Sequence, residues 1–223
     1  MRYAIASVLS VATLAAFTAP VSAGFYKTID VLDGGFSDWD DVPVVATDSI
    51  GDGTPIDFHT IQIANNDTHL FLRITYATLV NPNAGPNTNL AFDVDNNVAT
   101  GADIYGLGIV GSDAWFLSDA PYDQRTGWNV GSLSSNAGIA PYYTETTSQE
   151  YSIPRNLTFT SDSAPVFGSS FTVLAWSDWG SQTDATPGAF YTFASEAAVP
   201  EPAAMSLLAL GGLVALRRRR AAC

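Results

Sequence analysis

The 223-residue sequence is poor in cysteine and histidine, and each shortage argues against a class of protein. The single cysteine is Cys223, so no disulfide forms within the chain. His59 and His69 are the only histidines, and neither has a cysteine or glutamate at the spacing of a zinc site. The Gly-x-Ser-x-Gly motif of serine hydrolases is also missing. We therefore expect no enzymatic activity.

Positive charge is scarce as well. The chain has 22 acidic residues against nine lysines and arginines, and its formal net charge is −13. Between residues 24 and 199 the only basic residues are Lys27, Arg73, Arg125 and Arg155. Such a polyanion repels nucleic acids and acidic membrane surfaces. This composition excludes a nucleic-acid partner and favours binding of cations.

An apolar run opens the chain. Arg2 precedes an uncharged stretch, residues 3–17, and the small-residue sequence Val21-Ser22-Ala23 follows it. One leading charge, an apolar centre and a small-residue cleavage site are typical of a secretory signal peptide. We expect a signal helix within residues 1–23 and cleavage after Ala23.

A second apolar run, residues 203–216, lies near the C-terminus. As a helix it spans about 21 Å, which is short for a hydrocarbon core of about 30 Å. The basic end that follows is expected to stay on the cytoplasmic side. It consists of Arg217, Arg218, Arg219 and Arg220. This short apolar helix is therefore expected to hold the chain in the inner membrane only transiently.

The tail, residues 199–223, combines three parts in a fixed order. Pro200, Glu201 and Pro202 come first, the apolar run follows, and the arginines end it. This order resembles a PEP-CTERM sorting signal, also catalogued as an ice-binding protein C-terminal segment. The resemblance implies that an exosortase recognises the motif and cleaves nearby, which places the protein at the cell surface or outside the cell. A plain C-terminal membrane anchor is the alternative.

Helical periodicity is absent between these two ends. Short runs of β-branched and aromatic residues recur instead, separated by Asn, Asp, Gly and Pro. The pattern predicts an all-β fold, a single antiparallel, jelly-roll-like β-sandwich over residues 24–198. The clearest hairpin pairs 61–64 with 69–74 around Asn65-Asn66-Asp67-Thr68. The expected strands are 26–31, 43–47, 58–64, 69–76, 89–94, 114–117, 140–144, 151–153, 171–176 and 190–193.

Several short motifs of this segment follow one another in a recognisable order. They are residues 33–39, 63–71, 92–97, 151–154 and 184–191, with Glu150 directly before the fourth. Together they resemble a β-sandwich of the family-nine carbohydrate-binding-module-like, or DOMON-like, type. The resemblance implies the fold and, by analogy, a carbohydrate ligand. It places no ligand-binding aromatic residue.

Oxygen-bearing side chains alternate along residues 93–97, and more follow up to residue 103. Calcium favours six to eight such oxygens, and the spacing does not match an EF-hand. The modules that the chain resembles often hold structural calcium. We expect a calcium site at Asp93, Asp95, Asn97 and Asp103. The alternative is an Asx-rich turn whose side chains cap their own backbone. A further acidic group within residues 38–52 is expected to be solvated surface.

Five tryptophans offer flat faces that can stack on sugar rings. Trp39, Trp115 and Trp176 follow the opening motif or lie in expected strands, so we expect them to pack in the core. Trp128 and Trp179 lie among Gly, Asn and Ser residues that are typical of loops. These two are the candidate sugar-binding residues.

The leading hypothesis is an exported surface or extracellular-matrix protein whose sandwich binds a glycan or exopolysaccharide without catalysis. The alternative is a structural or adhesive matrix protein that divalent cations bridge through its acidic surface, with no specific sugar pocket.

Overall fold

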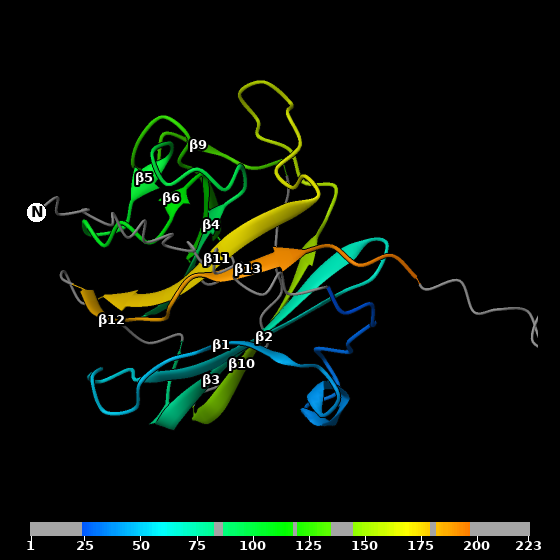
Figure 1. Cartoon of the computed structure of the whole chain (residues 1–223), viewed down its shortest axis with the longest axis vertical. Helices are drawn as coiled ribbons and strands as arrows, with labels where there is room; N and C mark the ends of the chain where they lie inside the picture. Colours follow the sequence, from blue (N-terminus) through cyan, green and yellow to red (C-terminus); the bar gives the residue numbers. More distant parts are fainter. Residues whose placement is uncertain (1–23, 83–86, 118–119, 135–144, 179–181, 197–223) are drawn as a thin grey trace, which may run out of the picture.

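Two antiparallel β-sheets stacked face to face form the body of the protein (Figure 1). This computed structural model describes residues 24–82, 87–117, 120–134, 145–178 and 182–196. Within these ranges no helix has the length and apolar character needed to cross a membrane. The expected signal helix and tail helix fall outside them.

The first sheet has the strand order β1-β2-β3-β10, and the second has the order β12-β11-β4-β7-β8-β9, with β13 also paired to β11. A separate ribbon pairs β5 with β6. All of these pairings are antiparallel, which confirms the all-β sandwich. The first sheet contains β1 (Val44–Thr47), β2 (Phe58–Asn65), β3 (His69–Val80) and β10 (Thr146–Pro154). The second contains β4 (Asn87–Asp93), β7 (Ala114–Leu117), β8 (Ala120–Asp123), β9 (Gly131–Ser132), β11 (Ser170–Asp178), β12 (Gln182–Ala185) and β13 (Ala189–Thr192). The ribbon consists of β5 (Ala102–Asp103) and β6 (Gly111–Ser112).

One predicted strand, residues 26–31, is wrong. Tyr26 makes only an isolated bridge to Asn65, and the segment then leaves the sheet edge. Ile29 and Val31 pack instead on the outer face of the first sheet, against Phe71. Burial of these apolar side chains, rather than strand pairing, determines the path of this segment. The predicted strand 140–144 lies outside the described residues.

The predicted hairpin is confirmed as β2 and β3. Asn66 Oδ1 accepts hydrogen bonds from the backbone N–H groups of Thr68 and His69, at 2.9 Å and 2.7 Å. Such Asx hydrogen bonds stabilise a tight turn. The resulting register places Ile61 opposite Ile74 and Ile63 opposite Leu72.

The main core lies between the two sheets, where alternate residues of each strand point inward. Phe92 of β4 is at its aromatic centre. The ring centroids of Phe116, Phe167 and Phe171 lie 5.3 Å, 5.6 Å and 5.4 Å from that of Phe92. These contacts join β4 to its neighbouring strands and to the loop before β11.

The N-terminal segment covers the outer face of the first sheet. Its 3-10 turn η1 (Ser37–Trp39) buries Trp39, whose Nε1 donates a hydrogen bond to Glu150 Oε1 at 2.6 Å. Gln62 Nε2 donates to the carbonyl oxygens of Trp39 and Val42, at 3.1 Å and 2.7 Å. The predicted packing role of Trp39 is confirmed.

Candidate functional site

The outer face of the second sheet carries a group of five aromatic side chains. We call it the aromatic platform, and it consists of Tyr105, Trp115, Tyr122, Trp128 and Trp176. Trp115 contacts three of the other four rings. Its centroid lies 5.6 Å from that of Trp176, 5.1 Å from that of Trp128 and 5.4 Å from that of Tyr122. The platform therefore joins rings from strands β7, β8 and β11 with rings from two loops.

Strand register brings these rings together. Trp115 on β7 lies opposite Tyr122 on β8 and opposite Ala91 on β4. Ala91 in turn pairs with Leu174, two residues before Trp176 on β11. Trp176 itself lies opposite Asn89 on β4, so the two indoles approach each other diagonally across Asn89 and the small Ala91.

The platform has a buried floor and an exposed rim. Trp115 and Trp176 are buried, which confirms their predicted packing role. Tyr105 and Trp128 each keep 47% of their surface exposed. A shallow pocket of about 380 Å³ lies beside them and is lined by Asp103, Tyr105 and Trp128. The exposed rings thus stand on a rigid aromatic base at the edge of a pocket.

Polar groups lie around the rings. Trp115 Nε1 donates to Asn89 Oδ1 at 3.2 Å. Gln124 Nε2 donates to Asn129 Oδ1 at 2.9 Å, beside Trp128 in the sequence. The buried Nε1 of Trp176 has no hydrogen-bond partner among the residues that the structure describes. The platform therefore combines apolar ring faces with amide and carboxylate groups.

The sequence singled out Trp128 and Trp179 as candidate sugar-binding residues but did not single out Tyr105, the second exposed ring of the platform. Trp128 lies on the rim as expected, but Trp179 falls outside the described residues. Tyr105 was missed because nothing in the sequence places its loop above β11. Its context gave one usable signal, since it is an aromatic residue next to Gly106 and near Gly108. Backbone φ angles of 51° at Tyr105 and 75° at Gly106 show the tight turn there.

The loop that carries Trp128 is closed by backbone hydrogen bonds. Gly127 N–H donates to the carbonyl oxygen of Gln124 at 3.2 Å, and Val130 N–H donates to that of Asp123 at 3.1 Å. Asn129 and Gly127 have φ angles of 53° and 148°, and Gly and Asn tolerate such positive values best. The loop is therefore a compact turn at the end of β8.

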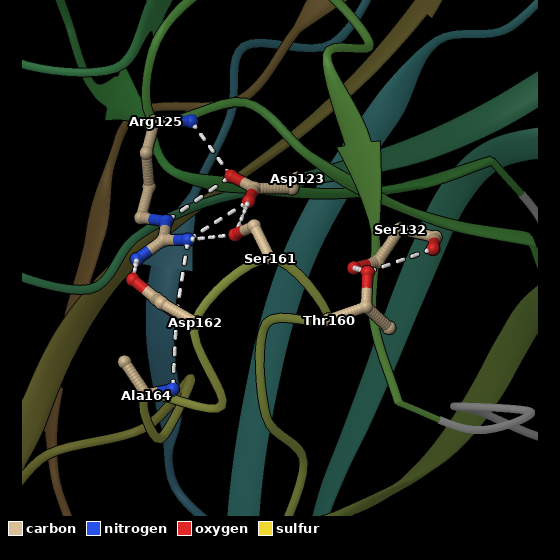
Figure 2. Close-up of polar contacts among 7 residues, drawn as sticks. All are labelled: Asp123, Arg125, Ser132, Thr160, Ser161, Asp162 and Ala164. Atoms are coloured by element: carbon tan, nitrogen blue, oxygen red, sulfur yellow. Dashed lines mark hydrogen bonds and ion pairs between the residues drawn. The ribbon is translucent and has the colours of Figure 1, made fainter.

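Arg125 fastens this loop to a neighbouring segment (Figure 2). Its Nε and Nη2 donate to the two carboxylate oxygens of Asp123, at 3.1 Å and 2.9 Å. Nη1 donates to Asp162 at 2.8 Å, and Nη2 also donates to Ser161 Oγ at 2.8 Å. The guanidinium carbon lies 3.6 Å from the centre of the Phe159 ring. Arg125 thus connects the Trp128 loop to residues 159–162.

Arg125 lowers the pKa of both carboxylates that it contacts. Burial opposes ionisation of Asp123, but hydrogen bonds from Arg125 outweigh it and hold the pKa of Asp123 below its usual value. The hydrogen bond from Arg125 likewise lowers the pKa of Asp162. Arg125 is therefore a positioning residue for the loop, held by two ionised partners.

Replacing Arg125 by lysine is expected to lower the free energy of unfolding by about 1–2 kcal/mol. Lysine keeps the charge but loses the planar fork that bonds both carboxylates and stacks on Phe159. Urea unfolding of both proteins at neutral pH measures the difference. Equal midpoints and slopes would show that charge alone holds the loop.

This network also predicts a pH dependence. The pKa of Asp123 is lower in the folded state, so its ionised carboxylate stabilises the folded protein fully above the unfolded-state pKa of about 3.9. This stabilisation is lost as the pH falls from there through the lower folded-state pKa. The difference in unfolding free energy between the wild type and Arg125→Gln should therefore be large at pH 7 and small near pH 2.5. A difference that stays constant over this range would contradict the ion-pair assignment.

The predicted calcium residues are only partly brought together. Carboxylate oxygens of Asp93 and Asp95 lie within 4.8 Å of each other and of one from Asp113. Asn97 contributes its backbone N–H, which donates to Asp93 Oδ1 and Asp95 Oδ1, both at 2.9 Å. Asp103 is not part of this group, and its Oδ1 accepts the Gly108 N–H at 3.0 Å. The capping turn is therefore present, and a three-carboxylate group lies within it.

Asp113 was missed because it is distant in the sequence. The pairing of β4 with β7 brings it to Asp93, and Asp113 N–H donates to the carbonyl oxygen of Phe92 at 2.8 Å. Burial raises the pKa of Asp113 to about 6 and also raises the pKa of Asp93. The neighbouring carboxylates are a second cause of both shifts. A bound cation would relieve this repulsion.

Comparison with known proteins gives two matches. Residues 198–220 match the PEP-CTERM protein-sorting motif, which confirms the resemblance of the tail. The motif marks a protein that is exported across the inner membrane, processed by an exosortase, and sorted to the cell surface or extracellular space. No curated protein sequence matches the chain.

Among solved structures, the fold is similar to a family 9 carbohydrate-binding module from Caldicellulosiruptor kristjanssonii in complex with cellotriose. The TM-score is 0.42 and the sequence identity is 10%, over 79% of this chain and 95% of the module.

Proposed function

We propose that the β-sandwich is a non-catalytic glycan-binding module that serves the protein at the cell surface or in the extracellular matrix. The observation that carries this proposal is the aromatic platform, in which Tyr105 and Trp128 are half exposed beside a shallow pocket. The sorting tail supports it, because the protein is delivered to where polysaccharides are found.

The physical argument rests on the shape of the two exposed rings. A pyranose ring has an apolar face of C–H groups and an edge of hydroxyls, so a flat aromatic face binds it while polar neighbours fix its orientation. Tyr105 and Trp128 supply faces whose centroids lie 6.4 Å apart at an interplanar angle of 60°. Asp103 lines the same pocket and supplies a carboxylate to accept hydroxyl hydrogen bonds. Packing on Trp115 and Trp176 limits the conformational entropy that the rings lose on binding.

Intrinsic fluorescence tests the proposal directly. The purified protein is titrated with a panel of soluble bacterial and plant polysaccharides, and binding to a glycan array is measured in parallel. We expect a saturable change in tryptophan emission with at least one ligand class, because Trp128 lies on the rim. A protein that binds no member of either panel would contradict the proposal.

A cation-bridged matrix role is the second candidate, and one observation favours it. Asp93, Asp95 and Asp113 present carboxylate oxygens within 4.8 Å of one another, and calcium prefers such oxygen ligands. In this second proposal calcium stabilises the sandwich at this group and bridges exposed carboxylates of neighbouring molecules. Calcium-dependent association, measured by light scattering, separates this role from simple glycan binding.

Calcium is expected to raise the melting temperature of EDTA-treated protein. Ligand at about 100 times its dissociation constant adds about 2.7 kcal/mol to stability. In a domain of this size that corresponds to a rise of about 5–10 °C. Differential scanning calorimetry measures the shift, and Asp95→Asn should reduce it because it removes one carboxylate. An unchanged shift in Asp95→Asn would exclude calcium binding at this group.

A further inference from the structure

A second group of carboxylates lies where the two sheets meet, apart from Asp93 and its neighbours. Asp48 directly follows β1, Asp52 lies in the loop before β2, and Asp184 belongs to β12. Carboxylate oxygens of these three residues lie within 4.8 Å of one another. The β1–β2 loop and β12 lie at the same end of the sandwich (Figure 1). The group therefore contains a residue next to the first sheet and a residue of the second.

Asp184 is buried, and both of its carboxylate oxygens accept backbone hydrogen bonds. Only 6% of it is exposed, and its Oδ2 accepts the Phe58 N–H at 2.7 Å while Oδ1 accepts the Ala185 N–H at 2.8 Å. Gly53 allows the loop to pass close to this carboxylate. A Cβ on Gly53 would lie 2.6 Å from Asp184 Oδ2 and 2.3 Å from the carbonyl oxygen of Ile56. The backbone of the loop is thus packed tightly against the acidic group.

Two carboxylate oxygens in this region are buried without a hydrogen-bond partner. They are Asp48 Oδ2 and Asp57 Oδ1. Asp57 is only 7% exposed, and its other oxygen accepts the Gly51 N–H at 2.8 Å. The negative charge of Asp57 acts on both Asp48 and Asp184. Buried carboxylate oxygens are normally paired or bound to a metal, so each of these two unpaired oxygens calls for a cation nearby.

No lysine or arginine among the described residues supplies that partner. Burial, together with the charges of Asp184, Asp52 and Asp57, raises the pKa of Asp48 to about 6. Burial also raises the pKa of Asp184, with Asp52 and Asp57 contributing. The four described lysines and arginines contact other groups: Lys27 binds Asp41, Arg73 binds Ser148, Arg125 binds Asp123 and Asp162, and Arg155 binds the carbonyl oxygen of Asn66.

The spacing of the group fits a calcium ion. Calcium–oxygen distances of about 2.4 Å allow two ligand oxygens of one ion to lie at most about 4.8 Å apart. The oxygens of Asp48, Asp52 and Asp184 satisfy this limit as they stand. Asp52 is exposed, so one side of the group remains open to water and to an entering ion.

We propose that Asp48, Asp52 and Asp184 bind a calcium ion that fastens the β1–β2 loop to β12, with Asp57 supplying additional buried negative charge. The ion joins the two sheets, where Phe58 N–H and Asp184 already form a direct hydrogen bond. The site is independent of the aromatic platform and of the group at Asp93.

Calcium stoichiometry tests the site directly. EDTA-treated protein is dialysed against calcium, and bound calcium is measured by elemental analysis and by isothermal titration. Asp52→Asn is the first variant, because an exposed aspartate tolerates replacement by an amide. We expect this variant to lose one calcium, or to bind it at least ten-fold more weakly. Asp40→Asn, an exposed aspartate outside the group, is the matched control and should bind as the wild type does.

Asp57→Asn provides a second test, based on the sign of a stability change. Without calcium it should raise the melting temperature, because it removes a buried carboxylate that lacks a cation. With saturating calcium that advantage should vanish or reverse, since the same charge then helps to hold the ion. Equal stabilisation with and without calcium, or an Asp52→Asn protein that binds calcium as the wild type does, would overturn the proposal.

Discussion

Replacing Trp128 by alanine is expected to weaken glycan binding by at least ten-fold and to leave the fold intact. The indole is half exposed and stands on a loop that Arg125 holds, so its loss removes a stacking face without opening the core. A loss of ten-fold corresponds to about 1.4 kcal/mol, which is within the range for one aromatic contact. Affinity electrophoresis or titration with the best ligand of the panel measures the change.

Two further variants serve as controls for this prediction. Trp128→Phe keeps an aromatic face and should retain part of the affinity. Leu79→Ala removes an exposed apolar side chain from the first sheet and should bind as the wild type does. If Trp128→Ala binds normally while its melting temperature is unchanged, the aromatic platform is not the glycan site.

Replacing Phe92 by alanine is expected to destabilise the protein by about 3–5 kcal/mol. Phe92 is fully buried between the sheets, and three phenylalanine rings surround it at 5.3–5.6 Å. Those rings come from β7, from β11 and from the segment before β11, so they cannot collapse together into the space. The cavity therefore persists in the folded state, and urea unfolding measures its cost.

The matched control is Phe190→Ala, which removes the same side chain from an exposed position on β13. Its effect should be below about 1 kcal/mol, because little apolar surface is lost from the interior. Similar losses for the two variants would show that Phe92 does not hold the sheets together.

Local sequence patterns predicted a large part of the fold. The alternation in residues 61–64 and 69–74, with an Asn-rich turn between them, is sufficient to specify the β2–β3 hairpin. The run at 114–117 matches β7 in both bounds. Strands β5, β6, β8, β9 and β12 were not predicted. They are two to four residues long and, unlike the equally short β7, contain no run of β-branched or aromatic residues.

The candidate sites were predictable only where their residues are neighbours in the chain. Trp128 was identified from its loop context, and Asp93 and Asp95 were identified from their alternate spacing. Tyr105 reaches the platform, and Asp113 reaches Asp93, only through the arrangement of the second sheet. The acidic residues after β1 were expected to be solvated surface, but the structure half-buries Asp48 and places it against Asp184.

The sequence by itself determined the all-β class, the acidic character and the sorting tail, because each depends on local composition or on a short ordered motif. Only the tertiary structure decided which aromatic rings form one surface and which carboxylates share a site. Asp48 and Asp184 are separated by more than a hundred residues, and the stacking of the two sheets brings their oxygens within a few ångströms. Sheet packing depends on the whole core, so no short segment of the chain carries that information.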